Sequence, residues 1–167
     1  MENIEEVTKR EQMTLLLKKA GWYPNRKINI SNFERQCIEN GIELFDSAQK
    51  FLEQFTGLDK TVYFKSYHPV KEIGLSLHDY SFYFISSPTE EIDFVDDYKA
   101  ILDFANEDCF YLGESGYHYP AVVAIGRSGK LYFKHDYSED VWVFNDLIES
   151  MERELGHHNI ETSSLYK

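Results

Sequence analysis

The spacing of apolar residues changes near residue 60 of this chain. Before that point they recur at intervals of three and four, which predicts amphipathic helices. After it they alternate or form short runs, which favours strands. The first helix is expected over residues 5–20, ending at Gly21. Its predicted buried face consists of Met13, Leu16, Leu17 and Ala20.

Two further helices are expected before residue 60. The pattern Ser31-x-x-Glu34 is a capping box, which predicts the start of a short helix. We expect that helix to bury Phe33, Cys37 and Ile38. A third helix is expected from about residue 46 to Gly57, where its apolar stripe ends.

Residues 121–125 form an apolar, largely β-branched run without polar alternation. Such a run predicts a central strand that is covered on both faces. Ser128-Gly129 predicts a tight turn, because Gly can adopt the positive φ that a hairpin turn requires. Residues 131–134 are then expected to return as the partner strand.

Shorter signals predict the other elements of the second half. Strands are expected over residues 62–64, 78–85 and 109–112, with 113–120 as a loop. A fourth helix is expected from a Thr89 cap to about Asn106, and a last helix from an Asn145 cap to Gly156.

The fourth helix is predicted to be half apolar and half acidic. Its expected core face consists of Phe94, Tyr98, Ile101, Leu102 and Ala105. Its expected solvent face carries Asp93, Asp96, Asp97 and Asp103. A second acidic group is predicted in the loop before the last helix, with Asp136, Tyr137, Glu139 and Asp140. Both groups are candidate contact surfaces.

The order of elements predicts one α+β domain, with N-terminal helices followed by a mainly antiparallel sheet on which helices pack. The chain of 167 residues is long enough to bury a core, and we assign the domain to residues 1–156. Residues 157–167 are polar and are expected to fray.

The net charge of −12 is concentrated in the second half of the chain. Residues 1–60 carry 9 Lys and Arg against 10 Asp and Glu, whereas residues 61–167 carry 8 against 19. Such a field repels nucleic acid and anionic membranes and attracts cationic partners. It also fits a simpler interpretation, in which acidic residues keep the protein soluble.

Composition argues against other classes of protein. No apolar run approaches the roughly 20 residues that span a bilayer, and a cytoplasmic protein is expected. Cys37 and Cys109 then predict two buried thiols, since disulfides are rare in that compartment. Neither their spacing nor the adjacent His157 and His158 resembles a metal site, and no cofactor is predicted.

An enzyme is not expected either. A catalytic interpretation would have to use Cys109, Glu114, His118 and the pair His135-Asp136. None of them lies in a nucleophile elbow, a Gly-rich phosphate loop or an H-E-x-x-H pattern. The residues that remain are acids and tyrosines, a combination that suits a cationic protein partner.

Three stretches resemble a known family. Residues 16–26, 51–58 and 123–133 are similar, in that order, to the SUKH superfamily, and the match is best with its third bacterial subgroup of immunity proteins. The resemblance spans roughly residues 13–155, and Gly21-Trp22-x-x-x-Arg26 is its most specific part. Gly57 and Gly129 belong to the other two stretches.

The resemblance implies an α+β fold and a protein that neutralises a secreted polymorphic toxin, commonly a nuclease. In that setting Trp22 is expected to pack where the first helix meets the sheet. Arg26 is expected to pair with a carboxylate or to cap carbonyl groups. Segment 78–108 departs from the usual family pattern, so the toxin type does not follow.

The expected mechanism is occlusion of a basic toxin, with the free protein a monomer or weak homodimer. Two alternatives remain open. An acidic DNA mimic would carry the same charge but would bind many DNA-binding proteins. A regulatory protein-binding module would bind weakly and neutralise nothing.

Overall fold

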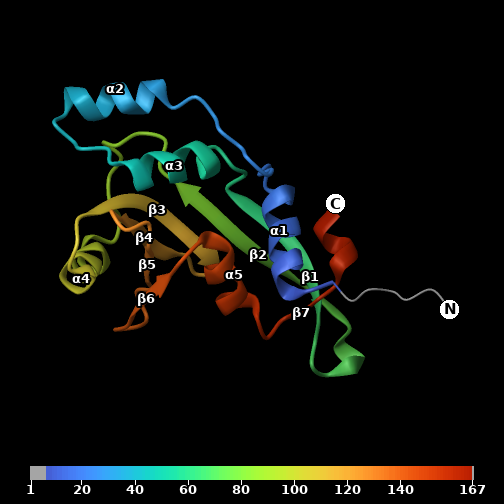
Figure 1. Cartoon of the computed structure of the whole chain (residues 1–167). Coiled ribbons are helices and arrows are strands. Elements are labelled where there is room, and N and C mark those ends of the chain that lie inside the picture. The colour runs from blue at the N-terminus through green and yellow to red at the C-terminus, as the bar shows by residue number, and fades with distance from the viewer. Residues whose placement is uncertain (1–6, 167) are drawn as a thin grey trace.

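The computed structural model describes residues 7–166, which form one seven-stranded antiparallel sheet with helices packed on it (Figure 1). The strand order is β6-β5-β4-β3-β2-β1-β7. The helices are α1 (Lys9–Lys19), α2 (Ser31–Glu39), α3 (Asp46–Phe55), α4 (Val95–Ala105) and α5 (Leu147–Leu155), with 3-10 turns η1 (Lys71–Ile73) and η2 (Thr162–Tyr166). The strands are β1 (Thr61–Tyr67), β2 (Leu75–Phe84), β3 (Cys109–Tyr117), β4 (Ala121–Gly126), β5 (Leu131–Lys134), β6 (Val141–Phe144) and β7 (Asn159–Ile160). The α+β prediction is confirmed.

The two faces of the sheet are covered unequally. On one face, apolar side chains from α1, α3 and α5 form the main core with alternate residues of the strands. On the other, α4 packs over β3 to β6 and forms a smaller core, in which Ile101 meets Val122, Ala124 and Tyr132. This division explains why every position of β4 is buried, as the apolar run predicted. Figure 1 shows the β1–β2 hairpin at the opposite end of the sheet from α4.

The first helices follow their predicted patterns with two exceptions. Met13, Leu16 and Leu17 are fully buried, and α1 begins at Lys9, after a Thr8 cap. The part of the predicted first helix before residue 7 lies outside the described residues. The prediction of a capping box is wrong, because the N-cap residue of α2 provides no side-chain hydrogen bond. Instead, the backbone amide of Ser31 donates to the Asn29 side chain at 2.8 Å. The inward placement of Ile38 is also wrong, since this residue is 81% exposed.

The fourth helix begins later than predicted. It starts at Val95, because residues 86–90 form a turn in which the Glu90 carboxylate accepts the backbone amides of Ser86 and Ser87. Thr89 therefore caps no helix. Phe94 and Leu102, which were expected in the core, are exposed, since the sheet contacts a narrower stripe of the helix that includes Tyr98 and Ile101.

The sheet is larger than the sequence indicated. Residues 113–117, expected in a loop, continue β3 past a bulge between Tyr111 and Gly113. Strand β6 was not predicted, and α5 is capped by Asp146 rather than Asn145. The expected fraying of residues 157–167 is wrong where the structure describes them, because β7 pairs with β1 and Leu165 is buried.

Candidate protein-binding surface

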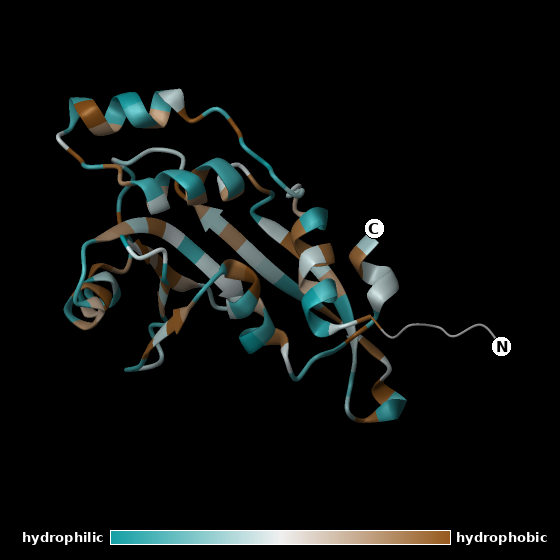
Figure 2. Ribbon diagram, in the orientation of Figure 1, coloured by the Kyte–Doolittle hydropathy of each residue, from teal (hydrophilic) through white to brown (hydrophobic). Residues whose placement is uncertain are grey.

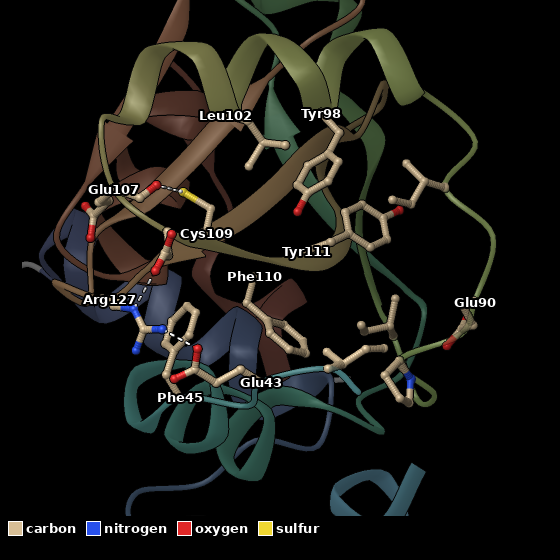
Figure 3. A pocket seen from close by; sticks show the side chains of 15 residues that line it. Glu43, Phe45, Glu90, Tyr98, Leu102, Glu107, Cys109, Phe110, Tyr111 and Arg127 are labelled. Atoms are coloured by element: carbon tan, nitrogen blue, oxygen red, sulfur yellow. Dashed lines mark hydrogen bonds and ion pairs between the residues drawn. The ribbon is translucent and has the colours of Figure 1, made fainter. Parts of the chain in front are cut away.

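An acidic groove lies beside α4 (Figure 3). Its volume is about 600 Å³, and it lies between α4, β3 and the loops that precede α3 and follow β4. Its carboxylates are Glu43, Glu90, Glu107 and Asp108. Arg127 is the cation among the lining residues, and both Glu43 and Asp108 pair with it. Among the described residues, Glu90 and Glu107 form no ion pair and accept hydrogen bonds from neutral groups, so they keep their negative charges.

Aromatic rings form much of the groove wall. Tyr98 and Tyr111 meet edge to face with centroids 5.4 Å apart, and Figure 3 shows both between α4 and β3. Burial and the nearby carboxylate of Glu114 raise the pKa of Tyr111 to about 12, so its ring stays neutral. Neutral rings beside carboxylates are a suitable surrounding for a Lys or Arg side chain.

Glu107 supplies a fixed negative charge at one end of the groove. It accepts hydrogen bonds from the Tyr132 hydroxyl at 2.6 Å and from the backbone amide of Ser128 at 2.8 Å. Burial acts to raise the pKa of Glu107, but these hydrogen bonds outweigh it, and the pKa is lowered. The carboxylate is therefore ionised at neutral pH.

A second hollow of about 300 Å³ lies on the same face, nearer the loop between β5 and β6. It brings together Asp97 and Asp136 from the two predicted acidic groups, together with Glu114 and Tyr83. Burial and the charge of Asp93 raise the pKa of Glu114. The two acidic groups thus border one surface.

The predicted contact residues divide into two kinds. Asp93, Asp96, Asp103, Asp136, Tyr137, Glu139 and Asp140 are all exposed. Asp93 precedes α4 instead of lying on it, because the helix starts at Val95. Asp97 differs from the rest: its carboxylate binds the Lys134 ammonium at 3.0 Å, and both side chains are largely buried. Asp97 holds α4 against the sheet.

The family-like stretches meet around a third groove, of about 520 Å³. Trp22, Phe55 and Gly129 all line it, although they come from three distant parts of the chain. Trp22, two residues after the C-cap of α1, stacks on Phe55 at the end of α3 and lines this groove together with Leu131 of β5. Gly21, Gly57 and Gly129 all have positive φ.

Arg26 fixes the end of α3. Its guanidinium donates to the carbonyl of Gln54 at 2.6 Å and lies beside Gly57. Burial lowers the pKa of Arg26, and the carbonyl is one of those that a helix end leaves without an intrahelical partner. This contact is a carbonyl cap, one of the two roles considered from the sequence.

Of the candidate catalytic residues, Glu114 and Asp136 share the 300 Å³ hollow, and Cys109, His118 and His135 lie elsewhere. Cys109 lines the acidic groove, and burial raises its pKa to about 11, so the thiol is protonated. His118 lies 3.6 Å from Asp79, whereas His135 faces Glu154 at 3.9 Å. Within residues 7–166, no group of three His, Cys, Asp or Glu side chains is placed to hold a metal ion.

Sequence reasoning missed the groove itself. Tyr98 was assigned only to the core, and Tyr111 only to a strand. Glu107 and Arg127 received no role. The alternation of Tyr111 with buried Phe110 and Leu112 was a usable signal, because it places the tyrosine on the opposite face of the strand.

The structure is thus an α+β domain with an acidic, tyrosine-lined face around α4. A sequence model of the SUKH-3 immunity proteins matches residues 9–155. The chain belongs to this family, whose members are immunity proteins and not enzymes. The expectations of a SUKH-3 relative and of a non-enzymatic protein are therefore confirmed.

Two other comparisons add nothing to the family match. Neither the curated proteins nor the solved structures yield a significant match. Within the described residues, no helix is both long enough and apolar enough to cross a membrane.

Proposed function

We propose that this protein neutralises a basic polymorphic toxin, of the nuclease class, by covering its substrate groove. Membership of the SUKH-3 family implies a toxin as the partner. The observation that supports a basic partner is the acidic surface around α4, which carries the exposed carboxylates of Asp93, Asp96, Asp103, Asp136, Glu139 and Asp140. Asp136 also lines the 300 Å³ hollow. A nuclease must attract polyanionic nucleic acid, so its substrate groove is cationic.

The surface has the parts that such binding needs. Exposed carboxylates on α4 and the β5–β6 loop steer a cationic partner and raise the association rate. The groove containing Tyr98 and Tyr111 can then receive a Lys or Arg side chain of the toxin between aromatic rings and carboxylates. Occlusion of this kind needs no chemical step by the immunity protein.

We further propose that the protein acts in the cytoplasm and is a monomer or weak homodimer before it meets the toxin. Support for a reducing compartment comes from Cys37 and Cys109, which are both free. A net charge of −12 also opposes close association of two copies.

The first test is co-expression with the candidate toxin domain encoded beside the gene for this protein. We expect bacterial survival and a complex that co-purifies. Death of the cells despite abundant soluble protein would contradict immunity. Binding to many unrelated basic proteins, with no preference for the toxin, would instead favour a DNA mimic.

The acidic contact is tested by replacing Asp93, Asp96 and Asp103 together with Asn. Asp97 is excluded, because its loss would disturb the packing of α4. We expect weaker toxin binding and a shallower dependence of affinity on salt. The matched control replaces three carboxylates that are exposed away from α4 with their amides: Glu11 on α1, Glu39 on α2 and Asp59 after α3. Equal affinity and salt dependence in the two triple variants would place the contact elsewhere.

A further inference from the structure

The first half of β2 has an inverted pattern of apolar and polar residues. Leu75 and Leu77 point to the face that lacks the main core and are exposed, whereas Ser76 and His78 point inward. In an antiparallel sheet with one solvated face, the apolar residues normally occupy the core face. The inversion is not a slip of register, because Tyr80, further along the same strand, is fully buried on the core face.

Strand β1 extends the same exposed apolar surface. Tyr63 and Tyr67 lie on this face, and Tyr67 is directly opposite Leu75. We call this the hairpin surface, which consists of Tyr63, Tyr67, Leu75, Leu77 and Tyr83. Leu77 is 64% exposed and Tyr63 is 52% exposed. In the described chain α4 packs over β3 to β6, at the other end of the sheet, and leaves this surface open (Figure 1).

The hydropathy of the ribbon shows the same feature. Hydrophobic positions appear in brown at the free end of the β1–β2 hairpin, around η1 (Figure 2). Val70 and Ile73 in this turn are both about half exposed. Exposed tyrosines and leucines that gather on one face of a soluble domain mark an interaction site more often than scattered single residues do.

The hairpin surface continues into the acidic surface. Tyr83 lines the 300 Å³ hollow together with Phe94, Glu114 and Asp136. Its hydroxyl is 3.0 Å from the hydroxyl of Thr61 on β1, so it also connects the two strands of the hairpin. One side of the sheet therefore carries the mainly apolar hairpin surface on β1–β2, whose strand face also includes Lys65 and Asp79, and an acidic half around α4.

We propose that the hairpin surface is the apolar anchor of the toxin interface, with the acidic surface beside it meeting the toxin's basic groove. This inference rests on the proposed function. Interfaces commonly combine buried aromatic and aliphatic anchors with charges at the rim. The occupant is a basic toxin domain rather than a second copy of this chain, since two copies would each bring a net charge of −12.

Leu77 offers a sharp test, because it lies directly opposite Lys65 in the register of β1 and β2. Leu77→Glu places a carboxylate beside that ammonium, which supports the strand pair and adds negative charge. Leu77→Thr removes most of the apolar surface, adds no charge and keeps a residue that favours strands. Ile38→Glu and Ile38→Thr are the matched controls, since Ile38 is 81% exposed on α2.

The assay is the affinity of each purified full-length variant for the purified, catalytically inactivated toxin domain, with thermal unfolding and sedimentation measured in parallel. We expect both Leu77 variants to weaken binding about 30-fold and both Ile38 variants to bind as wild type. The decisive comparison is Leu77→Glu, because a purely electrostatic interface would bind a basic toxin more tightly after this change.

Each other result overturns the inference. Leu77 variants that fold and bind as wild type, or a Leu77→Glu variant that binds more tightly, would exclude an apolar anchor while leaving the proposed function intact. A wild-type dimer that Leu77→Glu dissociates, with toxin affinity unchanged, would assign the hairpin surface to self-association. A wild-type protein that fails to bind the toxin would overturn the proposed function and this inference together.

Discussion

The ion pair between Asp97 and Lys134 should determine how firmly α4 is held against the sheet. The Asp97 carboxylate and the Lys134 ammonium are 3.0 Å apart, with side-chain exposures of 15% and 7%. The same ammonium also donates to the backbone carbonyl of His135 at 2.8 Å. Asp97→Asn removes the countercharge and leaves a buried cation without its carboxylate.

The expected loss of stability follows from this burial. Breaking a buried ion pair by removing one partner costs about 3–5 kcal/mol. Because the Asp97 side chain keeps some contact with water, we expect the lower end, about 3 kcal/mol. For a chain of this size that loss corresponds to a decrease of about 6–12 °C in the melting temperature.

Chemical and thermal unfolding measure this loss, with Asp103→Asn as the control. Asp103 is exposed on the same helix, and its replacement should change stability by no more than about 0.5 kcal/mol. Adding Lys134→Met to Asp97→Asn should recover part of the loss, because the unpaired cation is removed. Equal stability of Asp97→Asn and Asp103→Asn would refute a structural role for this ion pair.

Three further predictions concern stability. Burial lowers the pKa of both His78 and His158, so these side chains bind protons at higher pH in the unfolded chain than in the folded chain. The free energy of unfolding should therefore fall as the pH drops below about 6.5. The variant His158→Phe should make this fall less steep. Gly113→Ala should lower the free energy of unfolding, measured in urea, by more than about 4 kcal/mol, because the added Cβ would clash with the backbone of β2. Gly129→Ala should lower it by about 1–2 kcal/mol, because Gly129 has positive φ but open space around it. Leu165→Ala should cost about 2–5 kcal/mol by the same assay, and an unchanged midpoint would show that the C-terminal segment is not part of the core.

The local pattern of apolar residues was sufficient to predict which faces of α1 and β4 are buried. The spacing of Met13, Leu16 and Leu17 predicted the buried side of α1, and the unbroken apolar run predicted that β4 is covered on both faces. Both cases depend on side-chain periodicity, which the backbone geometry of helices and strands fixes within a few residues. The family-like stretches likewise predicted the SUKH-3 family.

Errors arose where a contact that the pattern did not show outweighed the local signal, a long-range one at the C-terminus and a local one at Thr89. The polar C-terminal segment lacks a pattern of its own, yet β1 supplies a pairing edge for β7 and α1 packs against η2. The Thr89 cap failed because Glu90 satisfies the backbone amides of that turn and delays the helix to Val95. Ile38 was predicted to be buried because the spacing of apolar residues in α2 does not show which of them contact the core.

For the candidate surface too, some features followed from the sequence and others only from the tertiary structure. The sequence by itself determined that the chain is an acidic α+β protein of the SUKH family type, because composition, charge and motif order do not depend on contacts. Only the tertiary structure separated Asp97 from its acidic neighbours, since Lys134 lies 37 positions away in the chain. The tertiary structure alone also revealed the hairpin surface. Whether Leu77 faces a core or solvent depends on where α4 packs, and α4 packs over β3 to β6.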